Sequence, residues 1–345
     1  MEIDHYNIWK NHIISKLNGN DVYLSVLENL KDTEFPVIFD INHLCDYLEL
    51  KIVIIYHILF FSEAFYREFK IPKRRGGDRV IMTPYPSLKY IQRWINDNIL
   101  VKLETHTASM AFSQGKSIVN NAYPHLGKKY ILKLDIKDFF PSIKFKHIYP
   151  IFKNIGYSKR VAYSLSLLCL NKEVLPQGAP TSPRLSNLVL LNLDKRLSSL
   201  AKKFSYVYTR YADDLTFSGD NIVWKFAEYV IEIIKSEGFE VNKSKTKLIS
   251  SKKKIITGIS ISNNYMTIPR KTKREYRAIA FNILRLTPHG YLNTYFLEDP
   301  VYIERVIGKM NFWHMIEPNN DYVKETILKL KEYNKKLLDQ MSSFK

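Results

Sequence analysis

The chain has 345 residues, of which 46% are hydrophobic and 25% charged. This composition excludes a disordered chain, a fibre and a small domain that needs disulfides or metals to fold. The 52 Lys and Arg outnumber the 34 Asp and Glu, for a net charge of +18, and because such cations neutralise phosphates and release counterions, a polyanionic partner is indicated, with nucleic acid first. A charged surface that serves only solubility gives the same composition.

Cysteine usage and the apolar runs indicate a compartment. Cys45 and Cys169 lie far apart and lack the spacing of a zinc site, so neither a disulfide framework nor zinc is expected, and a reducing cytoplasm fits. The N-terminus has two acids before its first Lys and does not resemble a signal peptide. The most apolar run, residues 52–61, is too short for a membrane span of about 20 residues. We therefore expect a soluble, cytoplasmic protein.

The first hundred residues predict helices, a hairpin and another helix. Residues 1–70 show helical periodicity with a break at Phe35-Pro36, which predicts an N-terminal helical extension. Next, Gly76-Gly77 separates two short β-prone pieces of a basic hairpin. After Pro86 the apolar positions recur at helical spacing, so a helix follows the hairpin.

The middle of the chain alternates strands with helices. Residues 130–140 are rich in β-branched and aromatic side chains, and residues 205–219 form two β-prone halves around an acidic pair. Between them, residues 158–170 and 182–204 predict two long amphipathic helices. This alternation predicts an α+β or α/β fold with a sheet backed by helices.

The last third carries most of the positive charge. Residues 241–345 contain 20 Lys and Arg against 9 Asp and Glu. Within them, residues 243–277 hold 11 basic residues and a single acid, Glu275. No repeat period of about 20–50 residues is visible, so a solenoid is not expected.

Three carboxylates are the strongest candidates for chemistry. Asp213 and Asp214 are adjacent between two β-prone runs, and a cation such as Mg²⁺ would offset their repulsion, although an Asp pair is also ordinary in turns. Asp135 lies among apolar residues of a predicted strand, where an unpaired carboxylate is costly to bury. Three carboxylates on neighbouring strands could hold two Mg²⁺ ions about 3.5–4 Å apart, which would activate a 3′-hydroxyl and steady a leaving pyrophosphate.

Four segments, in this order and spacing, resemble the palm motifs of reverse transcriptases: LKLDIKDFFPSI, LPQGAPTSPRLSN, YADD and EGFEVNKSKTKL. The resemblance covers roughly residues 70–345. It implies an α+β right-hand polymerase that makes DNA on an RNA template from deoxynucleoside triphosphates. The implied parts are an N-terminal helical extension (1–70), fingers (71–130), a palm with part of the fingers inserted (131–258) and a helical basic thumb (259–345).

The same resemblance implies roles for individual residues. Asp135 and Asp213 would be the principal ligands of two Mg²⁺ ions, with Ile136 and Asp214 completing the metal site. Lys245 matches a lysine proposed as general acid toward pyrophosphate, although Lys243 and Lys247 are close enough to compete for this role. The residues implied in nucleotide binding are Lys73, Arg75 and Arg79 at the triphosphate, Arg79 being favoured; Ile136; Phe140 as the aromatic steric gate against a 2′-hydroxyl; and Gln177 and Gly178.

Two shorter sequence motifs indicate a subclass of reverse transcriptases. Residues 121–125, NAYPH, resemble the NAxxH motif of retron reverse transcriptases, and Ile256-Thr257-Gly258 resembles their VTG motif with Ile in place of Val. Taken alone, the first motif is also typical of a loop whose His is hydrogen-bonded within the protein, and the second of a strand that ends at a Gly. Together they favour a bacterial retron enzyme. The RNA-binding residues expected on this basis, and from the basic thumb, are Asn121, His125, Thr257, Gly258, Arg270, Lys271, Lys273 and Arg274.

The retron resemblance also implies partners. They are a cognate structured noncoding RNA that is both primer and template, a DNA start from a 2′-hydroxyl, an RNA–DNA product (msDNA) used in phage defence, and an effector protein. Two alternatives stay open. One is another stand-alone bacterial reverse transcriptase, defence-associated or diversity-generating. The other is an RNA-binding scaffold with a vestigial site, against which the intact Asp135, Asp213, Asp214 and Gln177 weigh.

Overall fold

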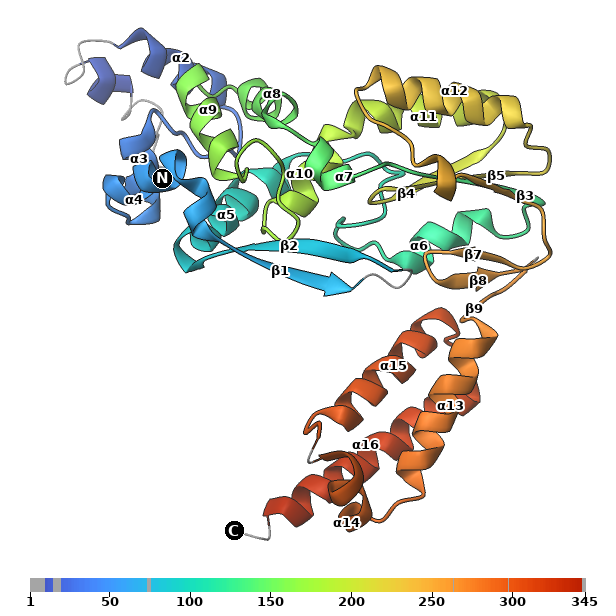
Figure 1. Cartoon of the computed structure of the whole chain (residues 1–345). Coiled ribbons are helices and arrows are strands. Elements are labelled where there is room, and N and C mark those ends of the chain that lie inside the picture. Colours follow the sequence, from blue (N-terminus) through green and yellow to red (C-terminus); the bar gives the residue numbers. More distant parts are fainter. Residues whose placement is uncertain (1–9, 15–19, 73–75, 263, 297, 343–345) are drawn as a thin grey trace.

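The computed structural model of the chain describes residues 10–14, 20–72, 76–262, 264–296 and 298–342. Figure 1 shows N-terminal helices and a long hairpin at one end, a sheet covered by helices at the other, and a helical bundle that projects from beside the sheet. The mixture of helices with antiparallel sheets confirms the predicted α+β class.

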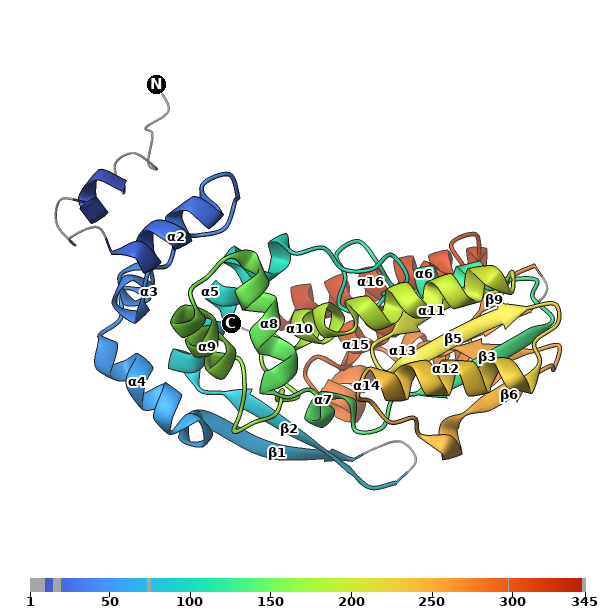
Figure 2. The same cartoon turned by 90° about the horizontal axis from the view of Figure 1, so that it is seen from above.

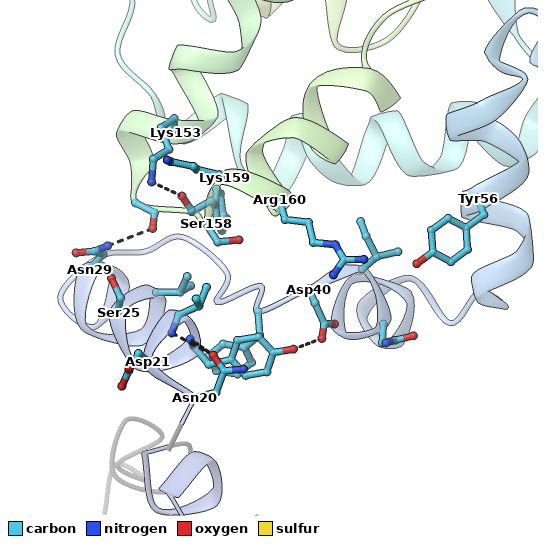
Figure 3. A pocket seen from close by; sticks show the side chains of 18 residues that line it. Asn20, Asp21, Ser25, Asn29, Asp40, Tyr56, Lys153, Ser158, Lys159 and Arg160 are labelled. Carbon is cyan, nitrogen blue, oxygen red and sulfur yellow. Dashed lines mark hydrogen bonds between the residues drawn. The ribbon is translucent and has the colours of Figure 1, made fainter. Parts of the chain in front are cut away.

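The N-terminal part contains the helices α2 (Asp21–Leu30), α3 (Ile41–Leu48) and α4 (Ile52–Phe60). Side chains of Asn20 and Asp40 cap α2 and α3 by accepting bonds from backbone N–H groups of the first turn. The Asn29 side chain donates to the carbonyl of Gly156, 3.3 Å away, in the turn between α8 (Phe145–Ile155) and α9 (Lys159–Leu168) (Figure 3). These contacts fasten the predicted helical extension to the rest of the chain.

A long antiparallel hairpin follows, made of β1 (Tyr66–Pro72) and β2 (Asp78–Pro84). The predicted hairpin is confirmed, but residues 66–70, which the sequence assigned to the helical extension, belong to β1. The reason is pairing: each of them is opposite a residue of β2, from Tyr66 with Pro84 to Lys70 with Val80. After it, α5 (Pro86–Asn98) begins with Pro at its first position, where no backbone N–H is needed.

The central sheet has four antiparallel strands in the order β4-β5-β3-β6. Its strands are β3 (Tyr130–Asp135), β4 (Val207–Tyr211), β5 (Asp214–Gly219) and β6 (Lys247–Ile249). Helices α11 (Leu191–Lys203) and α12 (Trp224–Ser236) cover one face of the sheet in both views (Figures 1 and 2). This confirms the predicted sheet backed by helices.

One predicted helix is two. Residues 182–204 form α10 (Ser182–Val189) and α11, which are separated at Leu190. The sequence contains no Gly or Pro at the break, and the side chain of Leu190 is fully buried. Tertiary packing therefore sets this bend, and hydrophobic periodicity continues through it.

The remaining elements belong to the sides of the sheet and to the bundle. The short helices α6 (Ile118–Ala122) and α7 (Phe139–Ser142) flank the sheet. A second sheet contains β7 (Lys254–Ile256), β8 (Ile259–Ile261) and β9 (Met266–Thr267). The bundle contains α13 (Arg270–Leu284), α14 (Pro288–Tyr291), α15 (Tyr302–Ile316) and α16 (Asp321–Ser342).

Two hydrophobic cores hold these parts. One runs from the N-terminal helices through α5 to the central sheet. The other joins α6 and the second sheet to the bundle. The predicted boundary at 70 falls inside β1, and the one at 258 falls in the turn between β7 and β8. The four-part division therefore stays a prediction, since strand pairing crosses both points.

Candidate active site

The acidic pair lies in a two-residue hairpin turn. β4 ends at Tyr211 and β5 begins at Asp214, and these two residues are paired across the ladder. Between them, Ala212 has φ of +55°, and a positive φ at the first central residue is what the favoured two-residue hairpin turns have in common. The backbone N–H of Ile136 donates to the carbonyl of Asp213 over 3.0 Å, which fixes the turn against the end of β3. The predicted hairpin turn is confirmed.

Asp135 ends the neighbouring strand and is paired with Asp214. Its side chain is buried, as the sequence predicts. The ammonium of Lys245, in the short helix 243–245, donates to both of its carboxylate oxygens over 2.8 Å. The structure thus brings Asp135, Asp213, Asp214 and Lys245 to one end of the central sheet.

Burial and mutual repulsion strain these carboxylates. The pKa of Asp213 rises to about 6, first because the group is buried and then because Asp135 and Asp214 are negative. Burial also raises the pKa of Asp214, and the charge of Lys133 opposes this. For Lys245 the bond and charge of Asp135 outweigh burial, so its pKa is raised and it stays protonated. Added positive charge at this place would relieve the repulsion.

A hollow of about 770 Å³ opens beside the three carboxylates. Its other charged lining is entirely cationic: Arg79, Lys133, Lys245, Lys247, Lys253 and Lys254. Lys254 is 6% exposed, and its side-chain ammonium takes part in no ion pair or hydrogen bond found among the described residues. Acidic side chains that could bind a metal ion and cationic side chains that could bind phosphate therefore line the same cavity.

Four of these lysines were missed by the sequence interpretation or named only as competitors. Lys133 precedes Asp135 by two residues and so shares its face of β3. Lys247 is paired with Lys133 across β6. Strand alternation could have found Lys133, whereas Lys254 belongs to a different sheet, Lys253 lies in the bend before it, and neither has a local signal.

The carboxylate oxygens are chemically suited to a hard divalent cation. Within the described ranges, however, no group of three or more His, Cys, Asp or Glu side chains is arranged as a ready metal site. The backbone of Ile136 lies at the same place, bonded to Asp213. The donor set thus fits a metal in its chemistry, while the Lys245 ammonium is the cation that contacts Asp135.

The predicted nucleotide-binding residues differ in their surroundings. Arg79 lines the hollow, whereas Lys73 and Arg75 lie outside the described residues. The half-buried ring of Phe140 meets the exposed ring of Phe112 edge-on, with centroids 6.5 Å apart.

Gln177 and Gly178 pack against the hairpin strand β2. The carbonyl of Gln177 accepts a bond from Met82 over 2.9 Å. Gly178 has φ of +131°, and a Cβ there would lie 2.8 Å from the Met82 carbonyl oxygen. The sequence analysis assigned this glycine to nucleotide binding. In the structure this glycine approaches β2 closely, which leaves no room there for a side chain.

The NAYPH and ITG motifs meet each other. The Asn121 side chain donates to the Thr257 hydroxyl over 3.3 Å. His125 is fully buried, with its ring nitrogens 2.6 Å from the Ser218 hydroxyl and 2.8 Å from that of Thr209, and burial lowers its pKa to about 3. Since Asn121 and His125 are buried, neither can contact RNA directly in this conformation. Gly258 is exposed in the turn beside Thr257.

The basic residues of α13 divide by exposure. Arg270, Lys271 and Arg274 are exposed. Lys273 instead pairs with Glu317 at 2.9 Å and lies over the buried ring of Trp313. It therefore helps to hold α13 on α15.

None of the helices in the described residues combines the length and the apolar character needed to cross a bilayer.

Comparison with known proteins gives concordant relatives. The family "Reverse transcriptase (RNA-dependent DNA polymerase)" matches residues 71–281. The Retron Ec86 reverse transcriptase of Escherichia coli is 34% identical over 254 residues, covering 72% of this chain and 79% of that protein. The Retron Mx65 reverse transcriptase of Myxococcus xanthus is 37% identical over 235 residues, covering 62% of this chain and 55% of that protein. Among solved structures, telomerase from Candida albicans in complex with a TWJ fragment of telomeric RNA matches with a TM-score of 0.45 and 13% identity, over 79% of this chain and 63% of that one.

Proposed function

Because this chain belongs to the retron reverse transcriptases, which are RNA-directed DNA polymerases, we propose that it copies one structured noncoding RNA into DNA. Synthesis would start from a 2′-hydroxyl of that RNA and leave an RNA–DNA hybrid (msDNA). One observation carries the polymerase site: Asp135, Asp213 and Asp214 lie at one sheet end, in a cavity whose other charged groups are cations.

Asp135, Asp213 and Asp214, with the backbone of Ile136, would hold two Mg²⁺ ions. The fit rests on oxygen ligands and on the raised pKa of Asp213, because crowded carboxylates gain most from a divalent cation. When bound, the ions would supply the charge that favours an ionised primer hydroxyl and offsets charge on the leaving pyrophosphate.

The chain's own groups would then orient and neutralise the substrate. Lys245, held protonated by Asp135, would donate a proton toward pyrophosphate. Arg79 and the lysines of the hollow would neutralise phosphates, and fixed cations serve this purpose without reorganising during the reaction. The ring of Phe140 would lie under the deoxyribose and exclude ribonucleotides.

Recognition of the RNA would use the exposed face of α13 and the turn at Thr257 and Gly258. Lys and Arg suit A-form RNA, which is read by shape and phosphates. Asn121 would act indirectly, because its bond to Thr257 ties that turn to α6. His125 would act indirectly through the central sheet, where it contacts Thr209 and Ser218. An effector protein and a role in defence against phage complete the proposal and rest on the family resemblance.

Two assays on the purified protein test this proposal. Sequencing of the co-purified nucleic acid should recover one structured RNA joined to DNA, and a heterogeneous mixture would contradict the retron assignment. Thr257→Ala should then impair self-primed synthesis on that RNA. The same variant should extend an annealed DNA primer on an unrelated RNA template at the wild-type rate. Thr257→Ser keeps the hydroxyl and is the matched control. Equal losses in both assays would instead indicate a folding defect.

A further inference from the structure

The cationic side chain nearest in sequence to the catalytic turn is fully buried. Arg210, three residues before Asp213, has no exposed surface, and neither has its partner Asp194 on α11. Nε and Nη2 of the guanidinium donate to the two Asp194 oxygens over 2.8 and 2.6 Å. Nothing in the proposed chemistry uses this pair, so its position beneath the turn needs another explanation.

The third nitrogen of Arg210 reaches the turn itself. Nη1 donates to the carbonyl of Ala212 over 3.1 Å and to the side-chain oxygen of Asn187 over the same distance. Ala212 is in the left-handed region, which residues with a Cβ adopt rarely. The next carbonyl, of Asp213, is held by Ile136. Both carbonyls of the turn are therefore fixed, one by a backbone N–H and one by a side chain.

Arg210 is itself anchored from several sides. Its backbone N–H donates to Ala108, and its carbonyl accepts from Met110, each over 2.8 Å. Asn187 lies on α10, and its amide donates to the carbonyl of Ala111 over 2.8 Å. A guanidinium presents five donors in a planar fork, so it can hold Asp194 and the turn at once. A Lys ammonium cannot reproduce that geometry.

We infer that Arg210 is a positioning residue for DNA synthesis: by holding the Ala212 carbonyl against the anchored Asp194 and Asn187, it keeps the turn in the conformation that directs Asp213 into the catalytic hollow. The inference rests on the proposed role of Asp213. Arg210 does not line the hollow, so it would act through the turn. Its loss would slow the chemical step more than it weakens binding.

The test is single-nucleotide incorporation on an annealed primer–template, with the maximal rate and the apparent Kd for the nucleotide measured separately. Arg210→Lys should lower the maximal rate roughly ten- to a hundredfold, because small misplacements of reacting groups cost this much. The nucleotide Kd should change less than about threefold, since uniform binding is untouched.

The matched control is Tyr208→Phe. The Tyr208 hydroxyl donates to the same Asp194 oxygen over 2.7 Å but makes no bond to the turn. It should lower the melting temperature while keeping the wild-type rate. If Arg210→Lys does not fold, Asn187→Ala replaces it: this change removes one of the two acceptors of Nη1, along with the Asn187 bond to Ala111, and should lower the rate by a smaller factor.

The outcomes separate cleanly. A selective loss of rate in Arg210→Lys or Asn187→Ala, with Tyr208→Phe unaffected, supports the positioning role. Rates that fall equally in all variants, or in none, or a loss that appears only in the nucleotide Kd, would overturn it. An inactive wild-type protein would instead refute the proposed function.

Discussion

Asp213→Asn should make the protein more stable while abolishing DNA synthesis. The carboxylate lies in the turn between β4 and β5, partly buried and facing two other acids. Replacing it with a neutral amide of nearly the same shape removes a proposed metal ligand, and with it the polymerase activity. The same change relieves repulsion in the metal-free protein.

The magnitude follows from the pKa. That of Asp213 is about 6 in the folded chain against an ordinary 3.8. At about 1.4 kcal/mol for each pH unit, the ionised group costs the fold at most about 3 kcal/mol at pH 7.5, which Asn recovers. Because the folded-state pKa is raised, the protonated Asp213 carboxyl favours the folded state. This contribution to the free energy of unfolding is fully present below pH 4 and is lost as the pH rises through 6. The gain from Asn should therefore be largest above pH 6 and shrink toward pH 4.

Thermal melting in EDTA, repeated across pH, measures this directly. We expect Asp213→Asn to melt several degrees above wild type at pH 7.5, and Mg²⁺ to stabilise wild type more than the variant. Asp220→Asn is the matched control, because Asp220 is exposed near the same sheet and should show neither effect. A variant that melts at or below wild type at pH 7.5 would refute the reasoning about crowded carboxylates. Retained synthesis above a few per cent would refute the metal-ligand assignment.

Three further predictions concern the cavity and the bundle. Phe140→Ala should admit ribonucleotides far better than wild type in single-nucleotide incorporation, and unchanged discrimination would locate the gate elsewhere. Lys254→Met should weaken binding to a primer–template severalfold in fluorescence anisotropy without lowering the melting temperature, because it removes a buried, unpaired charge that faces the hollow. Lys252 is exposed, so Lys252→Met is the control, and equal effects of the two substitutions would contradict the assignment. Replacing Arg270, Lys271 and Arg274 together with Ala should flatten the salt dependence of RNA binding, by up to about 0.9 in the logarithmic slope for each phosphate that is no longer neutralised. Lys273→Ala should mainly lower stability, since Lys273 pairs with Glu317, and a wild-type slope in the triple variant would mean that this face does not touch RNA.

The sequence by itself was enough to predict the acidic turn and the strand beside it. Adjacent Asp213 and Asp214 between two β-prone runs, and Asp135 inside another, are local patterns, because strand alternation and turn chemistry act over a few residues. The predicted strand over 130–140 ends earlier in the structure, at Asp135. The order of four motifs then identified the polymerase family, which comparison with known proteins confirmed.

Only the tertiary structure revealed which polar groups are inside and what they touch. His125 was expected at an RNA surface, yet it is buried between Thr209 and Ser218, 84 and 93 residues further along the chain. Arg210 and Asp194 look like ordinary surface charges in the sequence and are fully buried as a pair.

The physical reason is the range of the forces that decide each feature. Hydrophobic periodicity and turn preference depend on neighbours in sequence, so they can be predicted from a single sequence. Burial of a charge depends on a partner that arrives from another element, as Asp194 on α11 meets Arg210 on β4. No local pattern encodes that meeting, because it exists only once the sheets and helices have packed together.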